Sequence, residues 1–301
     1  MLTSVEFMKQ LLLKLGAISE SNIEIFQTFT RDREVNVYID TSSHVIFIDD
    51  FYVGEDEYRS GSYRLDQIQP TYEDRADLLR RTQDFSYLYL GKRVIDWGCG
   101  RGDFLRRIRA DIEVGIGVEL QENFRNLLTI EGIPCVEKLT EVKDMFDICF
   151  MFHALEHVPD PISILKDVSS HLSESGRVVV EVPHARDFLL HVMQLDSFKH
   201  FTLWSQHLVL HTRESLRLVA EAAELEVELI FGVQRYGISN HFEWLSNGRP
   251  GGHQKSLMSF EDNFLKSSYS NALSKIDAND TLIMIARKKQ TQKNRQNNDE
   301  S

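Results

Sequence analysis

Three glycines at alternate positions, Gly98, Gly100 and Gly102, carry the clearest sign of a binding site in this chain. A β-branched run precedes them and apolar residues at helical spacing follow, which predicts a strand, a tight turn and a helix over residues 92–108. Glycines in such a turn let a ligand lie directly against the backbone, and the free N–H groups of the next helix attract negative charge. The spacing therefore predicts a site for a flat, polar ligand.

The spacing of this turn also separates it from other nucleotide-binding motifs. The dinucleotide fingerprint G-x-G-x-x-G requires glycine where this chain has Asp103, and no G-x-x-x-x-G-K-[ST] loop occurs. The run from Asp96 to Gly102 instead reads D-x-G-x-G-x-G. Taken alone, a tight turn without a ligand is the structural alternative for this run.

A carboxylate, Glu119, ends the next predicted strand at residues 114–118. In a doubly wound sheet the ligand lies at the carboxyl ends of the strands, so Glu119 is expected to face the same crevice as Gly98. A carboxylate there can accept hydrogen bonds from both hydroxyls of a ribose.

Histidines give a second chemical signal. His153 to His157 reads H-x-x-E-H, the spacing of an inverted zinc-protease motif, but that motif needs a helix, whereas here a strand precedes the run and a proline turn follows it. A protease is therefore disfavoured. Residues 184–211 hold five further histidines, and imidazole suits proton transfer near neutral pH. Most of these five are expected at the surface or in packing.

Composition excludes several classes of function. The 301 residues carry a net charge of −12, which argues against a surface for nucleic acid or an anionic membrane. A small molecule is therefore favoured over DNA or RNA as the substrate. Three cysteines without a C-x-x-C pair form neither a disulfide framework nor a zinc ribbon. No apolar stretch approaches ~20 residues, and the first fifteen residues lack a basic region, so we expect a cytoplasmic protein without a membrane span.

The elements that must position these residues follow from periodicity. Capping boxes at Thr3-x-x-Glu6 and Ser21-x-x-Glu24 predict two helices, the second around Ile23 and Phe26, and residues 34–49 predict a hairpin. The aromatic and charged segment 51–64 is a loop, or alternatively a lid whose tyrosines contact the acceptor. A polar helix is expected over residues 72–90, a loop over 234–253 and a helix near 257–275. Buried strands alternate with helices between them, which predicts an α/β fold.

The glycine turn, Glu119 and the L-E-H-x-P-D-P run at residues 155–161 together resemble class I S-adenosylmethionine-dependent methyltransferases over residues 75–287. The resemblance implies a Rossmann-like seven-stranded sheet with helices on both faces and S-adenosyl-L-methionine as cofactor. It divides the chain into an N-terminal α+β appendage without zinc at 1–70, a methyltransferase domain at 71–287 with inserts at 184–211 and 234–278, and a disordered tail at 288–301. The implied cofactor contacts are Asp96, Gly98, Cys99, Gly100, Gly102, Glu119, Phe152 and His153, and Glu137 is a further acid near the adenine.

Within this family the chain looks most like enzymes of sugar and surface-polysaccharide biosynthesis. The segment Trp204–Leu208 resembles the Y-x-E-H-L of sugar C-methyltransferases, which makes His207 the general base, although Trp204 and Gln206 depart from that pattern. His157 is the second expected catalytic residue. Acceptor contacts are expected from both inserts and the 51–64 segment, namely Tyr58, His184, Arg235, Tyr236, Asn240 and His241.

The implied function is methyl transfer to a small polar acceptor, a sugar nucleotide or glycan precursor, without a metal. Two alternatives stay open. One is an O-methyltransferase of a phenolic or quinone-like acceptor, assisted by a metal at His153, Glu156 and His157, the turn at which ubiquinone-type O-methyltransferases carry such ligands. The other is a non-catalytic S-adenosylmethionine-binding protein. The oligomeric state is not predicted.

Overall fold

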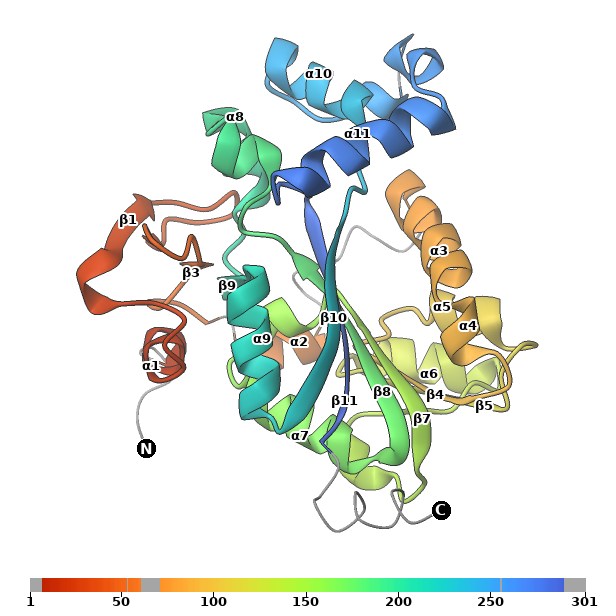
Figure 1. The fold of residues 1–301 in the computed structure, drawn as a ribbon. Helices are drawn as coiled ribbons and strands as arrows, with labels where there is room; N and C mark the ends of the chain where they lie inside the picture. The colour runs from red at the N-terminus through yellow and green to blue at the C-terminus, as the bar shows by residue number, and fades with distance from the viewer. Residues whose placement is uncertain (1–6, 53, 61–70, 255, 290–301) are drawn as a thin grey trace, which may run out of the picture.

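The computed structural model describes residues 7–52, 54–60, 71–254 and 256–289. Its centre is a seven-stranded sheet in the order β10-β11-β8-β7-β4-β5-β6 (Figure 1). Four neighbouring pairs of its strands are parallel, and β11 runs antiparallel to both β8 and β10. The bounds of these strands are β4 Arg93–Trp97, β5 Val114–Val118, β6 Cys135–Val136, β7 Phe146–Phe152, β8 Leu172–Pro183, β10 Leu225–Val233 and β11 Thr281–Lys288. This is the α/β architecture that the sequence predicts.

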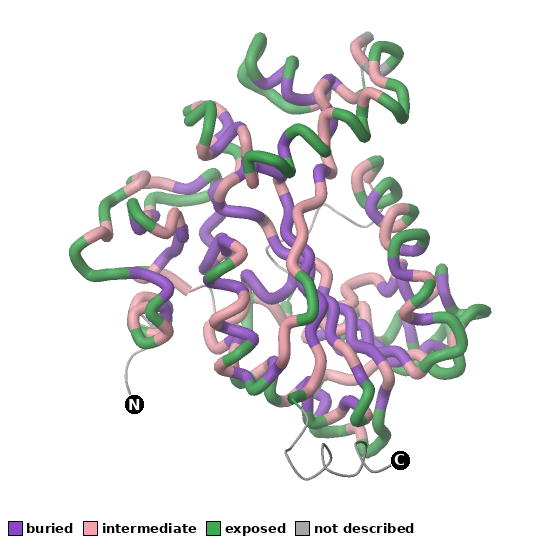
Figure 2. The backbone as a smooth tube through the Cα atoms, viewed as in Figure 1, coloured by how far each residue is buried: buried purple, intermediate pink, exposed green. Residues whose placement is uncertain are grey.

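Both faces of the sheet are buried, as Figure 2 shows for the middle of the molecule. Successive residues of β4 and β7 alternate between two cores: Ile95 and Cys149 pack with α7 and α9, whereas Val94 and Ile148 pack with α4, α5 and α6. The helices on the two faces are α4 Ser86–Tyr89, α5 Asp103–Ile108, α6 Glu122–Ile130, α7 Pro161–Ser170 and α9 Arg213–Ala222. The continuous apolar runs of these strands follow from burial on both sides.

A second, four-stranded sheet has the order β1-β2-β3-β9. Its strands are β1 Ile23–Gln27, β2 Val37–Asp40, β3 Ile46–Phe47 and β9 Val209–Leu210, and α1 Phe7–Lys14 packs near it. The predicted hairpin is present as β2 and β3. Because β9 comes from the 184–211 insert, the N-terminal part and the insert share one sheet. The boundary at residue 70 stays a proposal.

Further helices surround the open end of the large sheet. They are α2 Glu55–Ser60, α3 Tyr72–Asp84, α8 Asp196–Thr202, α10 Ile238–Asn247 and α11 Asn263–Lys275. Figure 1 shows α8, α10 and α11 gathered beyond the ends of β10 and β11. Single-turn helices are η1 Glu20–Asn22, η3 Leu139–Glu141, η4 Leu155–His157, the π-helix η5 Phe188–Val192, η6 Gly252–Gln254 and η7 Ser256–Phe260.

Four predicted elements are wrong or altered. The segment 51–64, expected to be a loop, contains the helix α2 over Glu55–Ser60. The helix expected around Ile23 and Phe26 is the strand β1, because its residues pair with β2. The loop expected over residues 234–253 contains α10, which ends at Gly248 in a left-handed conformation. The single helix expected over residues 72–90 is divided at Phe85 into α3 and α4.

Two other predicted features lie largely or wholly outside the described residues. The first capping box lies in residues 1–6 and nearly all of the tail in residues 290–301, which are outside the described ranges. Within those ranges, none of the helices has the length and apolarity needed to cross a membrane.

Candidate active site

The glycine turn joins β4 to α5, as its spacing predicts. Gly98, Gly100 and Gly102 all have left-handed backbone conformations, with φ of 72°, 52° and 75°. A side chain at Gly98 would place its Cβ 2.8 Å from Cβ of Ala154, whereas the space beside Gly100 is open to 4 Å. The turn is fixed to the neighbouring strand because the Gly98 N–H donates to the carbonyl oxygen of Val118 at 2.8 Å. The backbone at Gly100 is therefore the part that a ligand can approach.

Glu119 lies beside this turn, at the carboxyl end of β5. Its carboxylate accepts hydrogen bonds from the N–H groups of Gly100 and Gln121, both at 2.8 Å. Burial raises the pKa of Glu119 and raises that of Asp96, at the end of β4, to about 7. The structure thus brings Gly100, Glu119 and Asp96 to one edge of the sheet, the edge at which doubly wound folds bind their ligands.

The two cysteines on this side are close without being bonded. Cys99 in the turn has its sulfur 3.8 Å from that of Cys135 on β6, and Cys99, Cys135 and Cys149 are all free thiols. Both sulfurs fill the space above Gly117, where any Cβ would lie 2.6 Å from Sγ of Cys99. Close packing against glycine accounts for their position.

His153 follows β7 and stands between two carboxylates. Its backbone has φ of 50°, a conformation that non-glycine residues adopt rarely and mostly where the surroundings enforce it. Nδ1 lies 3.3 Å from Oε1 of Glu156, and Nε2 lies 3.2 Å from Oε1 of Glu181. Burial acts to lower the pKa of His153, but its bonds to Glu156 and Glu181 outweigh this and raise it. The protonated form of the ring is thereby favoured more than in an isolated imidazole, and its contact with the cofactor stays a prediction.

Three side chains converge next to it: Glu156 and His157 from η4, and His207 from the insert. One potential ligand atom from each lies within 4.8 Å of the others, and the two imidazole centroids are 5.0 Å apart. The insert is fixed here because the Leu208 N–H donates to the carbonyl oxygen of Glu156 at 2.8 Å. Among the described residues, Oε2 of Glu156 and Nδ1 of His207 are buried without a hydrogen-bond partner.

The charges in this cluster are set by burial together with the neighbouring groups. Burial opposes ionisation of Glu156, but its bond to His153 and the nearby histidines lower its pKa to about 2. Burial and the neighbouring His157 lower the pKa of His207 to about 3. At neutral pH the cluster therefore offers one carboxylate and an uncharged imidazole of His207. Such a set of oxygen and nitrogen donors fits a divalent cation.

The remaining predicted acceptor residues divide into two groups. The hydroxyl of Tyr58 lies 3.1 Å from Nδ1 of His157, so this residue joins the cluster. By contrast, three residues are almost fully buried and bonded elsewhere within the protein, namely His184 to Asn279, Asn240 to Gly251 and His241 to Tyr269. The structure does not bring these three to the cluster, and their contact with an acceptor stays a prediction.

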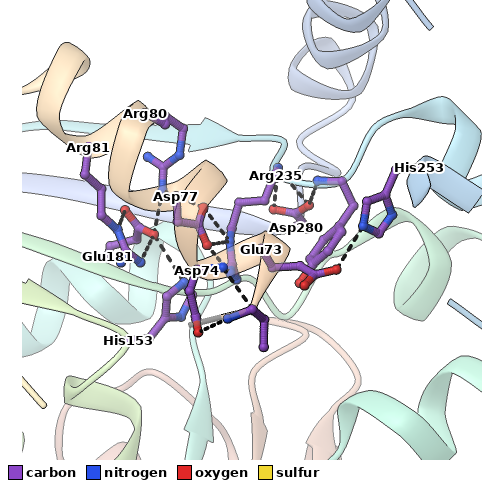
Figure 3. Close-up of polar contacts among 12 residues, drawn as sticks. Glu73, Asp74, Asp77, Arg80, Arg81, His153, Glu181, Arg235, His253 and Asp280 are labelled. Atoms are coloured by element: carbon purple, nitrogen blue, oxygen red, sulfur yellow. Dashed lines mark hydrogen bonds and ion pairs between the residues drawn. The ribbon is translucent and has the colours of Figure 1, made fainter. Parts of the chain in front are cut away.

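Helix α3 carries charged residues that sequence reasoning missed (Figure 3). Glu181, fully buried at the end of β8, accepts from Arg80 at 2.8 Å and from Arg81 at 2.7 Å. Asp77 is bonded to the predicted acceptor residue Arg235, whose Nε lies 2.9 Å from Oδ2. A signal for this network exists in the sequence, since Glu181 interrupts the apolar run of β8.

A cavity of about 180 Å³ is lined in part by the Asp77–Arg235 pair. Rings of Tyr72, Tyr236 and His253 line it, together with Glu73, whose Oε1 lies 2.9 Å from Nε2 of His253. It is bounded by α3 and by the start of α10 and α11. The predicted residues Arg235 and Tyr236 therefore border this pocket.

Comparison with known proteins identifies a domain family. A family model for a methyltransferase domain matches residues 71–230. The ubiquinone biosynthesis O-methyltransferase of Aeromonas salmonicida is 25% identical over 194 residues, which cover 59% of this chain and 81% of that relative. The enzyme of the same name from Vibrio vulnificus strain YJ016 is 26% identical over 125 residues, 38% of this chain and about half of its own length, 51%.

Solved structures with some likeness include a SAM-dependent methyltransferase from Archaeoglobus fulgidus, with a TM-score of 0.48, 20% identity and coverage of 71% of this chain and 94% of that one. A putative methyltransferase from Bacillus halodurans has a TM-score of 0.46 and 19% identity over 71% of this chain and 100% of that one. The family model spans more than half of the 301 residues and includes the glycine turn, Glu119 and the η4 turn. The chain therefore belongs to the class I methyltransferases that use S-adenosyl-L-methionine as cofactor.

Proposed function

We propose that this enzyme transfers the methyl group of S-adenosylmethionine to a hydroxyl oxygen of a phenolic or quinone-like acceptor, beside Glu156, His157 and His207. The observation that carries the proposal is a pair of buried atoms without a hydrogen-bond partner, Oε2 of Glu156 and Nδ1 of His207. Each is of a type that binds metal ions through a lone pair. The names of the relatives, ubiquinone biosynthesis O-methyltransferases, support this acceptor class over the sugar acceptor that the sequence resemblance favoured.

The reaction asks little covalent chemistry of the protein. The acceptor oxygen attacks the sulfonium methyl in line, the carbon–sulfur bond breaks with its electron pair going to sulfur, and the hydroxyl proton is released. Because the sulfonium is already a good leaving group, the protein contributes alignment, exclusion of water and removal of that proton. In this proposal the cofactor contacts are Asp96, Gly98, Gly100 and Glu119.

The three side chains of the cluster have distinct roles. His157 donates from Nδ1 to the carbonyl oxygen of Gln206 at 2.8 Å. The lone pair of its neutral ring is therefore on Nε2, the atom that would bind the metal ion. His207 is too weak a base to keep a proton at neutral pH, but its lone pair is available throughout that range. His153 holds one oxygen of Glu156 and leaves the other for a ligand.

This donor set supports metal assistance, the alternative that the η4 turn raised. Glu156, His157 and His207 would hold the ion, with His207 in place of the His153 that the sequence suggested. A divalent cation bound there lowers the pKa of an acceptor hydroxyl and so favours the nucleophilic oxyanion.

The test measures release of S-adenosylhomocysteine with catechols and other phenols on one side and nucleotide sugars on the other. We expect turnover with phenols that falls after chelation and returns with a divalent cation. His207→Ala should reduce turnover roughly a hundredfold without changing cofactor affinity in calorimetry. His200→Ala, on the exposed surface of α8, is the matched control. A fully active His207→Ala would refute the role of the cluster.

A second candidate, a sugar acceptor, is favoured by the cavity beside Arg235. Its rings suit the apolar face of a sugar, and its carboxylates suit hydroxyl donors. Turnover with nucleotide sugars alone would replace the phenolic proposal, and binding of the cofactor without turnover on any acceptor would favour a non-catalytic protein.

A further inference from the structure

The six-residue helix α2 contacts two loops at the carboxyl ends of the strands. One loop lies on each side of the glycine turn and Glu119. Tyr58 lies against His157 in the η4 turn, with its hydroxyl 3.1 Å from Nδ1 and the two ring centroids 5.9 Å apart. The next residue, Arg59, forms an ion pair of 2.8 Å with Glu137, directly after β6. Two adjacent side chains thus reach the ends of two distant strands.

The strand order shows what lies between these contacts. From β7, which precedes His157, to β6, which precedes Glu137, the sheet runs through β4 and β5. Neighbouring strands are ~4.8 Å apart, so the two anchors are separated by roughly 14 Å of sheet edge. The glycine turn follows β4 and Glu119 follows β5. A helix that touches both anchors must therefore pass across the cofactor-binding edge.

The anchor at Glu137 is itself tied to the cofactor acid. Arg125 of α6 has Nη2 3.5 Å from Oε2 of Glu137, and its Nη1 donates to the carbonyl oxygen of Glu119 at 2.8 Å. The contacts Arg59–Glu137–Arg125–Glu119 therefore form a continuous polar chain from α2 to the backbone of Glu119, the residue beside the glycine turn.

We propose that α2 is a strap that closes over bound S-adenosylmethionine, and that Arg59 is the positioning residue that keeps it closed. Tyr58 fixes the acceptor side of the strap and Arg59 fixes the adenine side. Cofactor and product then exchange only when the Arg59–Glu137 pair opens. This concerns the cofactor alone and does not depend on the identity of the acceptor.

The experiment follows association and dissociation of S-adenosylhomocysteine by stopped-flow fluorescence, using Trp97 at the end of β4 as the reporter. For Arg59→Ala we expect both rate constants to rise roughly threefold, the effect of one partly exposed ion pair, while the dissociation constant changes less. Arg59→Lys should retain most of the wild-type behaviour. High salt should narrow the difference between wild type and Arg59→Ala, because it screens the pair.

The controls separate a strap from other roles. Arg107→Ala, an exposed arginine of α5, should leave both rate constants unchanged. Tyr58→Phe, which removes the hydroxyl, should accelerate exchange further when combined with Arg59→Ala. If Arg59→Ala raises only the dissociation rate, Arg59 contacts the cofactor directly and the strap is refuted. Unchanged rates in a folded Arg59→Ala protein would refute it as well.

Discussion

Glu119 combines a predicted contact with an observed one. It is the acid predicted to hold the ribose hydroxyls, and in the structure it also accepts hydrogen bonds from the N–H groups of Gly100 and Gln121. The same carboxylate thus orients the glycine turn and offers its remaining lone pairs to a ligand. A change at this residue affects both.

We therefore expect Glu119→Ala to weaken S-adenosylmethionine binding roughly ten- to a hundredfold, the range for losing charge-assisted hydrogen bonds. Titration calorimetry measures the affinity. Glu122→Ala, three residues further in the first turn of α6, is a control that should bind normally. Unchanged affinity of Glu119→Ala would contradict the assignment of this edge to the cofactor.

Some residues of the candidate site could be predicted from the sequence and others could not. The glycine spacing and Glu119 were readable because each follows its own strand directly. The partners of Glu181 were not, since Arg80 and Arg81 lie about a hundred residues earlier and pair with it only in the fold. Likewise, the replacement of His153 by His207 in the candidate donor set depends on where the insert returns to η4.

At the scale of elements, α3 is held to the sheet mainly by charge. It is anchored by Arg80 and Arg81 to Glu181, by Asp77 to Arg235, and by Asp74 to Arg101 in the glycine turn. Only two of its residues, Asp77 and Thr82, are buried. Among these anchors, Glu181 is fully buried and accepts from two arginines, so we expect it to contribute most to the position of α3.

Glu181→Gln should lower the free energy of unfolding by about 3 kcal/mol, because it leaves two arginines and His153 facing a neutral group. We also expect faster hydrogen exchange in α3 than in α5. Urea unfolding and exchange mass spectrometry measure the two effects. Asp84→Asn, whose carboxylate is half-exposed and 4.0 Å from Arg80, is a control expected to change stability by less than about 0.5 kcal/mol. Equal losses in both variants would be inconsistent with this account.

The mispredicted elements have a common physical cause. The Ser21-x-x-Glu24 capping box favours a helix locally, but Ile23 and Ile25 extend because β2 supplies hydrogen-bond partners from residues 37–40. The segment of α10 was expected to be a loop because its aromatic and polar residues show no clear helical period. In the structure, the capping glycine Gly248 and burial of Trp244 stabilise a helix. Both outcomes were decided by tertiary contacts that local patterns do not contain.

At the scale of the whole molecule, folding buries two carboxylates that the unfolded chain exposes. Burial, followed by the nearby Asp280, raises the pKa of Asp187 to about 7, and burial raises that of Asp96 to about 7. The ordinary value is 3.8 for both. These two groups therefore keep protons in the folded state that they lose in the unfolded state between about pH 4 and 7, so their own contribution to stability falls as pH rises through that window. Buried histidines such as His207, with a pKa lowered to about 3, contribute with the opposite sign.

Between pH 5 and pH 8 we expect the free energy of unfolding of Asp187→Asn to gain roughly 2 kcal/mol relative to that of the wild type, because the variant lacks the destabilising ionisation of Asp187 and each pKa unit corresponds to about 1.4 kcal/mol. The amide keeps an oxygen for the N–H groups of Leu189 and Leu190. Urea unfolding at both pH values measures the difference. Asp196→Asn, an exposed residue of α8, should leave the pH profile unchanged. A change with pH equal to that of the wild type in Asp187→Asn would show that the folded protein ionises this group without cost.

The pairing of β3 with β9 has a consequence for biosynthesis. Val209 and Leu210 complete a sheet whose other three strands end by residue 47, so more than 160 residues must be synthesised before the last strand can add. Until then the edge of β3, with Ile46 and Phe47 fully buried in the finished protein, has no partner strand. The nascent chain is therefore exposed to wrong strand pairing while β4 to β8 are translated, and a chaperone that shields this edge would act during that interval.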